Sequence, residues 1–319
     1  MAQSNIASTQ DKLLFVWTHD TSPGANRDQY VDIAQCLSIV NRRFYRQGMN
    51  YAVGSIEFAA RSGGRVEVGI VPCTWVADNS TTKAFENWKD QRAEVLKESP
   101  TLKAKWSDFK VHLDERHATV GFANNLTPVD SDGGVYALGE WTASEFVVPI
   151  TGGSGGLGNA QEVTMHVVGD HIPNGPFNNA VTSAGLIKSY ADSRSIILAP
   201  DPVQPPGYNT NMYIRESSHD EMSADIIQNV TNFNDMPPYD LDNYPGGDTQ
   251  APTAEYVDTG IVSNYGDATV FSKSVIPGFI SPLGLLKFTT YDFGEEEDIS
   301  MVINLVPGNY KGILAEGGL

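Results

Sequence analysis

Most of the chain after residue 107 consists of short segments with the composition and alternation of β-strands. In "EVTMHVVG" (162–169), for example, Val163, Met165 and Val167 stand at every second position, the period of a strand with one buried face. The 30 Gly and 18 Pro of the sequence supply turns between such segments. This pattern predicts a mainly β fold. The segments expected to be strands are 11–20, 108–113, 117–122, 134–150, 162–169, 195–200, 268–276, 285–293 and 299–307.

The helical patterns lie in the first hundred residues. Residues 79–98 carry apolar side chains at helical spacing and are followed by Pro100, so they predict the best helix of the chain. Residues 28–46 show the same spacing and predict a second helix. Between them, two alternating segments in 50–76 flank a Ser-Gly-Gly turn at 62–64, which predicts a β-hairpin.

Strands in this number, with two short helices and long loops, predict a β-sandwich of jelly-roll type. No segment divides the chain cleanly, so residues 1–319 are expected to form a single jelly-roll domain with long loop insertions. The longest loop, at about 201–256, is rich in Pro, Asn and Asp. A compact domain tolerates such a loop mainly where the loop is functional or covers a surface.

The segment "TGGSGGLGNAQ" (151–161) contains both G-x-G-x-x-G and G-x-S-x-G, the patterns of dinucleotide-binding enzymes and serine hydrolases. Both patterns need a helix after the glycines, whereas the residues that follow here alternate like a strand. We therefore expect a glycine-rich connection between two strands. An enzyme of either class would rest on this loop alone, and the sequence predicts a protein that is not an enzyme and needs no cofactor.

The charge of the chain restricts its partners. A formal net charge of −18 argues against an ordinary nucleic-acid-binding protein, which has a basic surface. The charge is uneven, because residues 1–120 hold 15 basic and 14 acidic residues (+1), whereas residues 121–319 hold 6 and 25 (−19). Cys36 and Cys73 are too isolated for a disulfide framework or a zinc site. We expect no signal peptide, membrane span or membrane partner.

Other candidate sites are less specific. His112 and His117, like His166 and His171, would point to opposite faces of a strand, which disfavours a metal site. A Ser154 triad with His166 or His171 is not excluded by spacing. The acid-rich segments 130–134, 240–248 and 294–300 could bind calcium, but solvated turns explain them more simply. Glu140, Trp141 and Glu145 lie together as in a glycosidase, although Glu140 and Trp141 would point opposite ways on a strand.

The segment "NRRFYRQGMNY" (41–51) departs from the acidic character of the chain. It interleaves Arg42, Arg43 and Arg46 with aromatic residues that include Tyr45, the mixture that binds phosphates and stacks on bases of single-stranded nucleic acid. Salt bridges on an amphipathic helix, or a subunit interface rich in Arg and Tyr, would explain the same residues.

The segments "LSIVNRRFYRQGMNYAVGSIEF", "VEVGIVPCTWVADNSTTKAFENWKDQRAEVLKESPTLKAKWSDFKVHLD" and "INLVPGNYKGILAE" resemble the major capsid proteins of small circular single-stranded DNA viruses that encode a replication initiator, especially unclassified environmental ones. The resemblance covers residues 36–120 and the C-terminal end. It implies a jelly-roll subunit of the virion that assembles with copies of itself into an icosahedral shell around single-stranded DNA, without catalytic residues.

Carried onto this chain, the resemblance places Arg42, Arg43 and Arg46 on the inner, genome-facing surface, and the loops of 201–256 on the outside or at symmetry axes. Many of these capsid proteins begin with an arginine-rich arm, whereas this chain begins "MAQSNIASTQ". Either internal arginines and cations hold the genome or another protein packages it. Trp88 and Trp106 are the first candidates for contacts between subunits. The alternative function is a carbohydrate-binding or carbohydrate-active β-sandwich.

Overall fold

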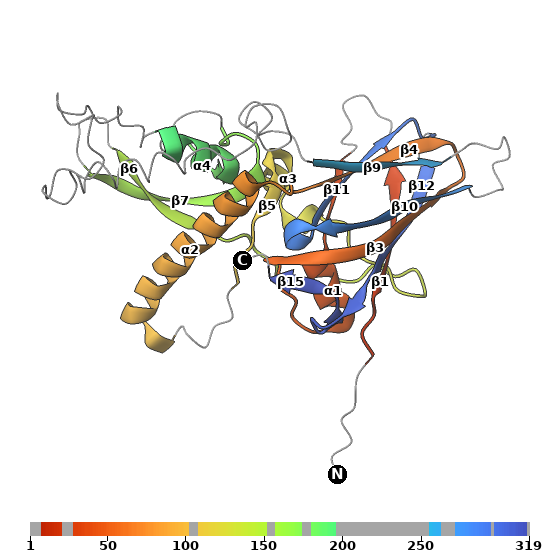
Figure 1. The fold of residues 1–319 in the computed structure, drawn as a ribbon, viewed down its shortest axis with the longest axis horizontal. Helices are drawn as coiled ribbons and strands as arrows, with labels where there is room; N and C mark the ends of the chain where they lie inside the picture. The colour runs from red at the N-terminus through yellow and green to blue at the C-terminus, as the bar shows by residue number, and fades with distance from the viewer. Residues whose placement is uncertain are drawn as a thin grey trace, which may run out of the picture.

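The computed structural model describes residues 8–20, 28–101, 108–151, 157–173, 180–195, 255–262, 272–294 and 297–317. The fold is mainly β, as the sequence predicts, with two antiparallel sheets packed as a sandwich (Figure 1). The first sheet contains, in order, β1 (Lys12–His19), β12 (Glu297–Leu305), β3 (Met49–Ala60) and β10 (Ser272–Ser281), with β15 (Ala315–Gly317) also paired to β3. The second contains β2 (Asp28–Asp32), β11 (Leu285–Tyr291), β4 (Gly64–Ile70) and β9 (Glu255–Val262).

The eight long strands of the sandwich pair in a nested order along the chain. The first strand, β1, pairs with the eighth, β12, and the second, β2, pairs with the seventh, β11. The third, β3, pairs with the sixth, β10, and the fourth, β4, pairs with the fifth, β9. Pairings of β12 with β3 and of β11 with β4 join these ribbons into the two sheets. The chain therefore folds as a long double ribbon whose strands alternate between the sheets.

The core lies between the two sheets. Along β1, the burial of side chains alternates strictly, so that Leu13, Phe15 and Trp17 face inward. Phe58 of β3 and Phe288 of β11 are fully buried and meet edge to face, with ring centroids 6.0 Å apart. Because these two phenylalanines come from different sheets, their contact joins the two layers.

The predicted hairpin in 50–76 is wrong. Its two segments do form strands, β3 and β4, but they belong to different sheets. Residues 61–63 carry the chain from one sheet to the other. A short turn with a glycine after two alternating segments is typical of a hairpin, but it also fits a corner of a sandwich, where both strands bury one face in the shared core.

Helix α1 (Ile33–Asn41) is shorter than the predicted helix over 28–46. The carboxylate of Asp32 accepts a hydrogen bond from the Gln35 N–H at 3.1 Å and so caps the start of the helix. The residues before this cap pair with β11 as strand β2. The helix ends at Arg42, which has a left-handed φ of 52°, so the arginine-rich residues after it are irregular rather than helical.

Helix α2 (Trp75–Glu98) confirms the predicted helix and extends it at its N-terminus. Thr74 caps it by accepting the Ala77 N–H at 3.3 Å, so the helix starts before the predicted residue 79. The helix begins an insertion between β4 and β9 that lies beside the sandwich (Figure 1).

The insertion has its own mixed sheet. Strand β7 (Leu157–Val168) pairs antiparallel with β6 (Phe146–Thr151) and parallel with β5 (His112–Asp114) and β8 (Ser183–Gly185). The helical elements of this region are α2, α3 (Glu115–Val120), η2 (Phe122–Asn124) and α4 (Leu186–Ser195). Its hydrophobic core includes Phe109, Leu113, Met165, Val167 and Ile187, and it also takes in Leu283 and Leu285 from the sandwich. The single-domain organisation of 1–319 stays a prediction.

Several expected strands are confirmed and others are wrong. Residues 11–20, 162–169, 268–276, 285–293 and 299–307 overlap β1, β7, β10, β11 and β12. Residues 117–122 are not a strand, because Asp114 accepts the His117 N–H at 2.8 Å and starts helix α3 instead. Residues 134–145 form no strand, and only the end of 134–150 does so, in β6. Residues 196–200 and the loop at 201–254 lie outside the described residues.

The glycine-rich loop connects two paired strands, as the sequence predicts. Thr151 of β6 is in register with Leu157 of β7, and residues 152–156, which include Ser154, lie outside the described residues. The element after the glycines is strand β7 and not a helix. Neither the dinucleotide-binding nor the serine-hydrolase pattern therefore has its structural context here.

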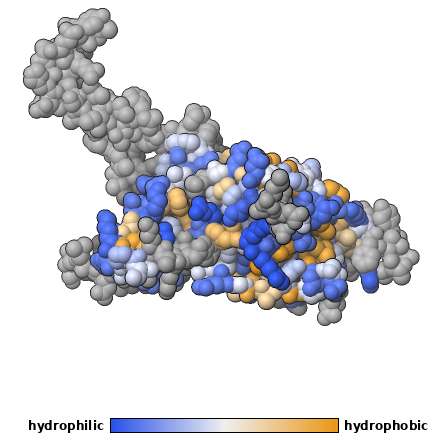
Figure 2. Space-filling view, turned by 90° about the horizontal axis from the view of Figure 1, so that it is seen from below, coloured by the Kyte–Doolittle hydropathy of each residue, from blue (hydrophilic) through white to orange (hydrophobic). Residues whose placement is uncertain are grey.

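The additions to the sandwich gather at one of its ends. Asp32 at the end of β2 is in register with Leu285 at the start of β11, and Ile70 at the end of β4 is in register with Glu255 at the start of β9. Helix α1 follows β2, the insertion follows β4, and η4 (Pro282–Gly284) precedes β11. The short pair β13 (Pro307–Gly308) and β14 (Gly312–Ile313) follows β12. Seen from below, hydrophobic and hydrophilic residues are intermixed over the sandwich half (Figure 2).

Candidate nucleic-acid interface

The three predicted arginines lie on the loop that follows helix α1. Arg42 and Arg43 are exposed, and the Arg46 side chain is 67% exposed with its Nε 4.0 Å from Oδ1 of Asp108. Arg42 also caps the C-terminus of α1, where a positive charge complements the helix dipole. The loop therefore presents guanidinium groups to the surface, as the interpretation of this segment requires.

The structure contradicts the role predicted for Tyr45. Its side chain is fully buried, and its hydroxyl donates a hydrogen bond to the carbonyl of Lys311 at 3.0 Å. Its ring also meets Tyr310 edge to face at 5.9 Å. No base could stack on a ring buried in this way, so Tyr45 anchors the arginine-rich loop to the C-terminal segment instead.

A pocket of about 470 Å³ opens beside Arg42 and Arg43. Phe44, Tyr136 and Trp141 supply aromatic rings to its lining. The pocket is lined by Gln35, Ser38, Ile39, Arg42, Arg43, Phe44, Tyr136, Ala137, Gly139, Glu140 and Trp141. Tyr136 and Trp141, almost a hundred residues later in the chain, thus supply the accessible aromatic rings that Tyr45 was predicted to supply.

The sequence alone does not indicate that Tyr136 and Trp141 line this pocket. Its pattern groups Trp141 with Glu140 and Glu145 and gives the expectation that Glu140 and Trp141 point to opposite faces of a strand. That expectation is wrong, because residues 134–145 form no strand and both residues line the same pocket. Nothing in the local spacing indicates that this segment returns to helix α1.

Asp32 holds Trp141 in place behind the pocket. The indole Nε1–H of Trp141 donates to Oδ2 of Asp32 at 2.9 Å, and the Gln47 amide donates to the same oxygen at 2.9 Å. Asp32 is fully buried, and burial raises the pKa of its carboxyl to about 6 against the opposing effect of these hydrogen bonds. One carboxylate thus links the start of α1, the arginine-rich loop and the tryptophan.

Lys110 adds a further positive charge near the pocket. Its ammonium lies 4.6 Å from the centroid of the Trp141 ring, a cation–π distance. The side chain is almost completely buried, and burial lowers its pKa although Asp108, Asp32 and Glu140 act in the opposite direction. Arg42 and Arg43 therefore line the pocket, and Lys110 contacts one of its aromatic rings without lining it.

The raised pKa of Asp32 predicts a pH dependence of stability. From about pH 4 to pH 6 the folded chain keeps a proton that the unfolded chain releases, so the free energy of unfolding falls as pH rises across this window. The expected decrease is about 3 kcal/mol. Urea unfolding of the wild type and of Asp32→Asn at pH 4 and pH 7 tests it, with the exposed Asp90→Asn as control. An Asp32→Asn profile that follows the wild type would contradict this assignment.

Of the two tryptophans predicted to contact other subunits, Trp88 and Trp106, only Trp88 is described. Trp88 is partly buried within its own chain, with its ring centroid 6.2 Å from that of Phe85 and 5.8 Å from that of Phe109. Arg92 lies over the Trp88 ring at 5.7 Å. Replacing Trp88 with alanine is therefore expected to reduce folding stability as well as any contact between subunits. Trp106 lies outside the described residues.

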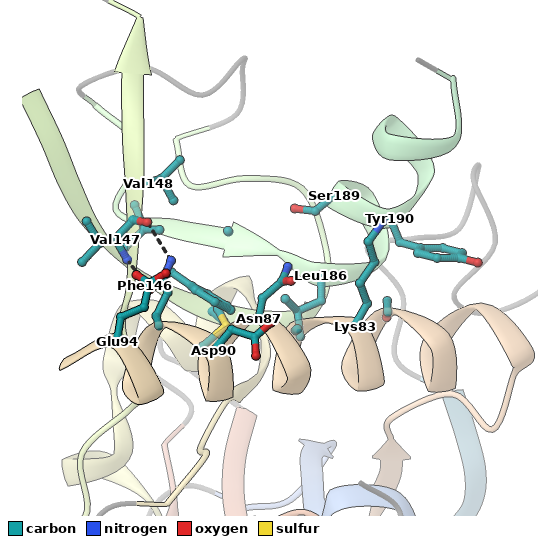
Figure 3. Close-up of a pocket in the computed structure, with 16 residues that line it drawn as sticks. Lys83, Asn87, Asp90, Glu94, Phe146, Val147, Val148, Leu186, Ser189 and Tyr190 are labelled. Atoms are coloured by element: carbon teal, nitrogen blue, oxygen red, sulfur yellow. Dashed lines mark hydrogen bonds between the residues drawn. The ribbon is translucent and has the colours of Figure 1, made fainter. Parts of the chain in front are cut away.

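A second hollow of about 490 Å³ lies between α2 and the sheet of the insertion (Figure 3). Phe146, Val148, Val163, Met165 and Leu186 give it an apolar floor, and the facing side of α2 contributes Lys83, Asn87, Asp90, Gln91 and Glu94. The Gln91 side-chain amide donates to the Val147 carbonyl at 2.9 Å and accepts the Val147 N–H at 3.1 Å. Gln91 thus pairs with strand β6 as a neighbouring strand would.

His112, His117, His166 and His171 are buried in the insertion. The expectation that His112 and His117 point to opposite faces is wrong, because His117 lies on helix α3 and the two ring centroids are 5.0 Å apart. His166 pairs with His112 across the sheet and shares a 2.8 Å hydrogen bond with Ser183. Burial lowers the pKa of His112 and of His166 to about 4. Among the described residues, no group of three ligands could hold a metal ion.

The acid-rich segment 130–134 uses its own carboxylate to close a turn. Oδ1 of Asp130 accepts the N–H of Asp132 at 3.0 Å and that of Gly134 at 2.7 Å. This is an Asx-type turn, in which side-chain oxygens satisfy nearby backbone groups. Segment 240–248 and residues 295–296 lie outside the described part of the chain.

No known protein family matches the sequence, and neither a curated protein nor a solved structure matches it. In the part of the chain that the structure describes, no helix is long and apolar enough to cross a membrane.

Proposed function

We propose that the chain is a jelly-roll capsid subunit that assembles with copies of itself into a closed shell around single-stranded DNA. The observation that carries the proposal is the nested pairing of the eight sandwich strands, first with eighth through fourth with fifth. A jelly roll has this pairing, because it is one long antiparallel ribbon wrapped into two sheets. Jelly rolls form viral shells, lectins and some enzymes. The fold is therefore compatible with a capsid subunit but does not by itself distinguish it from the other two classes.

The surface of the sandwich supports assembly. On the outer face of the first sheet, Leu14 and Val16 of β1 are 37% and 45% exposed, and Val275 of β10 is 56% exposed. Cross-strand register links Leu14 to Val302 and then, through Glu57, to Val275, so apolar side chains recur across the sheet. Contacts of modest area become collectively stable when closed symmetry repeats them.

The arginine-rich loop supports a nucleic-acid partner. Arg42, Arg43 and Arg46 are the candidate genome contacts, and they lie at the end of the sandwich that carries α1 and the insertion. The excess of acidic residues in 121–319 repels the negatively charged DNA backbone at long range. Binding of single-stranded DNA is therefore expected to be weak at physiological salt and to fall steeply as salt increases.

Size-exclusion chromatography with light scattering tests self-assembly. The full-length chain is purified and run at several protein, salt and calcium concentrations. Assembly predicts a leading species of uniform, very high mass in equilibrium with a small one. A constant monomer or dimer under all conditions would overturn the shell, and recognition of glycans on an array by that species would favour the carbohydrate-binding alternative.

A further inference from the structure

The pocket beside the arginine-rich loop has the composition of a binding site for one nucleotide. We propose that it holds a single unstacked DNA base against Phe44, Tyr136 and Trp141, while Arg42 and Arg43 contact the adjoining phosphates. The inference rests on the proposed function, since it takes DNA as the partner. It assigns base contacts to a segment, 136–141, that no basic or nucleic-acid motif marks.

The dimensions of the pocket suit a small planar group. A volume of about 470 Å³ lies within the usual range of small-molecule sites. Phe44 and Trp141 are inclined to each other at 49° with centroids 6.3 Å apart, so they present a bent aromatic wall rather than a collapsed stack. Aromatic rings accept any base through its π face, which makes such a site tolerant of sequence.

The charges around the aromatic wall favour a phosphate at the mouth. Arg42 and Arg43 both line the pocket and are exposed, and planar guanidinium groups bind phosphate oxygens in pairs. Glu140 is the acidic residue in the lining, so cations predominate there. A neutral sugar would use the aromatic wall but carries no negative charge that could attract the two guanidinium groups.

A pocket of this kind selects single strands over duplexes. In a duplex each base is stacked and paired, so its face reaches an aromatic wall only after it is pulled out, which costs a few kcal/mol. A single strand offers its bases without that cost. The same geometry makes Asp32 a positioning residue, because its hydrogen bond fixes the orientation of the Trp141 indole.

Fluorescence anisotropy with a labelled thymidine oligonucleotide of about 12 nucleotides tests the site, since single-strand sites typically span 4–16 nucleotides. The protein is the smallest species that the full-length chain gives on size exclusion. The central variants are Tyr136→Ala, with Tyr136→Phe as the conservative replacement, and the pair Arg42→Gln with Arg43→Gln. Tyr136 is only partly buried, and no hydrogen bond of its side chain is found among the described residues, so Tyr136→Ala is expected to change stability little, which urea unfolding of the variant checks.

Arg65→Gln is the matched control. The Arg65 guanidinium lies over Tyr291 at 4.4 Å and near Glu67 at 3.7 Å, so it is an exposed arginine–aromatic pair outside this pocket. Arg65→Gln removes one positive charge, whereas the double variant removes two. An effect of net charge alone would therefore appear in this variant at about half the size it has in the double variant.

Tyr136→Ala is expected to weaken binding roughly 10-fold, and Tyr136→Phe to restore it, because stacking needs the ring and not the hydroxyl. The logarithm of the association constant falls as the logarithm of the salt concentration rises. Replacing both arginines is expected to make this slope less steep by about 1.4, or about 0.7 for each phosphate contact. The duplex of the same length is expected to bind more weakly than the single strand, and Arg65→Gln to behave as wild type.

Equal affinity for duplex and single strand, or a Tyr136→Ala variant that binds as tightly as wild type, would contradict the proposal that this pocket binds a base. Release of the labelled oligonucleotide by an added neutral glucan would also contradict the proposed nucleotide site. Failure here is separable from failure of the shell. Shells in the sizing experiment with no effect of Tyr136→Ala remove the pocket alone, whereas oligonucleotide binding by a chain that never assembles removes the shell alone.

Discussion

Replacing Asp114 with alanine is expected to lower the free energy of unfolding by about 3–5 kcal/mol, because it leaves partly buried polar groups without their shared acceptor. The Asp114 carboxylate accepts the Tyr30 hydroxyl at 2.8 Å, the Lys287 ammonium at 3.0 Å and the His117 N–H at 2.8 Å. Lys287 belongs to the sandwich and Asp114 to the insertion, and Lys287 also lies 3.2 Å from Asp28 of β2. This ionic cluster therefore joins the two parts of the molecule.

The same carboxylate gives the experiment a pH signature. Burial alone would raise the pKa of Asp114, but Lys287 and the hydrogen bonds from His117 and Tyr30 hold it below its usual range. A depressed pKa contributes stability that is present above about pH 4, the unfolded value, and is lost as pH falls through the folded value. Urea unfolding at pH 7 and below pH 4 should show this loss in the wild type and not in Asp114→Ala.

A double variant distinguishes a lost partner from a lost packing volume. Asp114→Leu combined with Lys287→Met removes both charges and fills similar space, so it is expected to cost less than Asp114→Ala alone. A decrease of less than 1 kcal/mol in Asp114→Ala, or a double variant that is the less stable of the two, would contradict the role of the cluster.

Phe58→Ala is the second change with a large expected effect, a loss of about 3–5 kcal/mol in the free energy of unfolding. Phe58 is fully buried in β3, and its partner Phe288 is fully buried in the other sheet. Removal of either ring leaves a cavity between the layers that rigid strands cannot close. Denaturant unfolding of the purified chain measures the loss.

A double-mutant cycle tests whether the two rings act across the sandwich. Phe58→Ala and Phe288→Ala are expected to couple by about 0.5–1.5 kcal/mol, the value of an edge-to-face aromatic pair. Val275→Ala, on the exposed face of β10, is the control and should change stability by less than about 0.5 kcal/mol. Additive losses from the two phenylalanines would mean that the sheets do not meet at this point.

Local patterns predicted elements well where a single face had to be buried. The alternation in 162–169 and the helical stripe in 79–98 both survive in the structure, because burial of those faces is what holds the elements. The same patterns gave the wrong secondary structure where a capping side chain determines where a helix begins. Asp32 turns strand into helix within the segment 28–46, and Asp114 does the same before His117, although neither changes the hydrophobic period.

Pairing of strands was beyond local patterns. The turn at 62–64 looks the same whether the next strand joins its neighbour or crosses to the opposite sheet, and only the rest of the sandwich decides. The candidate site shows the same limit. Exposed arginines could be predicted from 41–51. The burial of Tyr45 and the position of Trp141 could not, because they depend on the contacts Tyr45–Lys311 and Trp141–Asp32, whose members are 266 and 109 residues apart in the sequence.

Negative-stain electron microscopy of the leading size-exclusion species, after nuclease treatment, tests whether the chain forms a closed shell around single-stranded DNA. We expect uniform closed shells in which single-stranded DNA is protected from the nuclease. Monomers, dimers or open aggregates across the range of salt and calcium concentrations would contradict it, even if the strand pairing of the sandwich were correct in every detail.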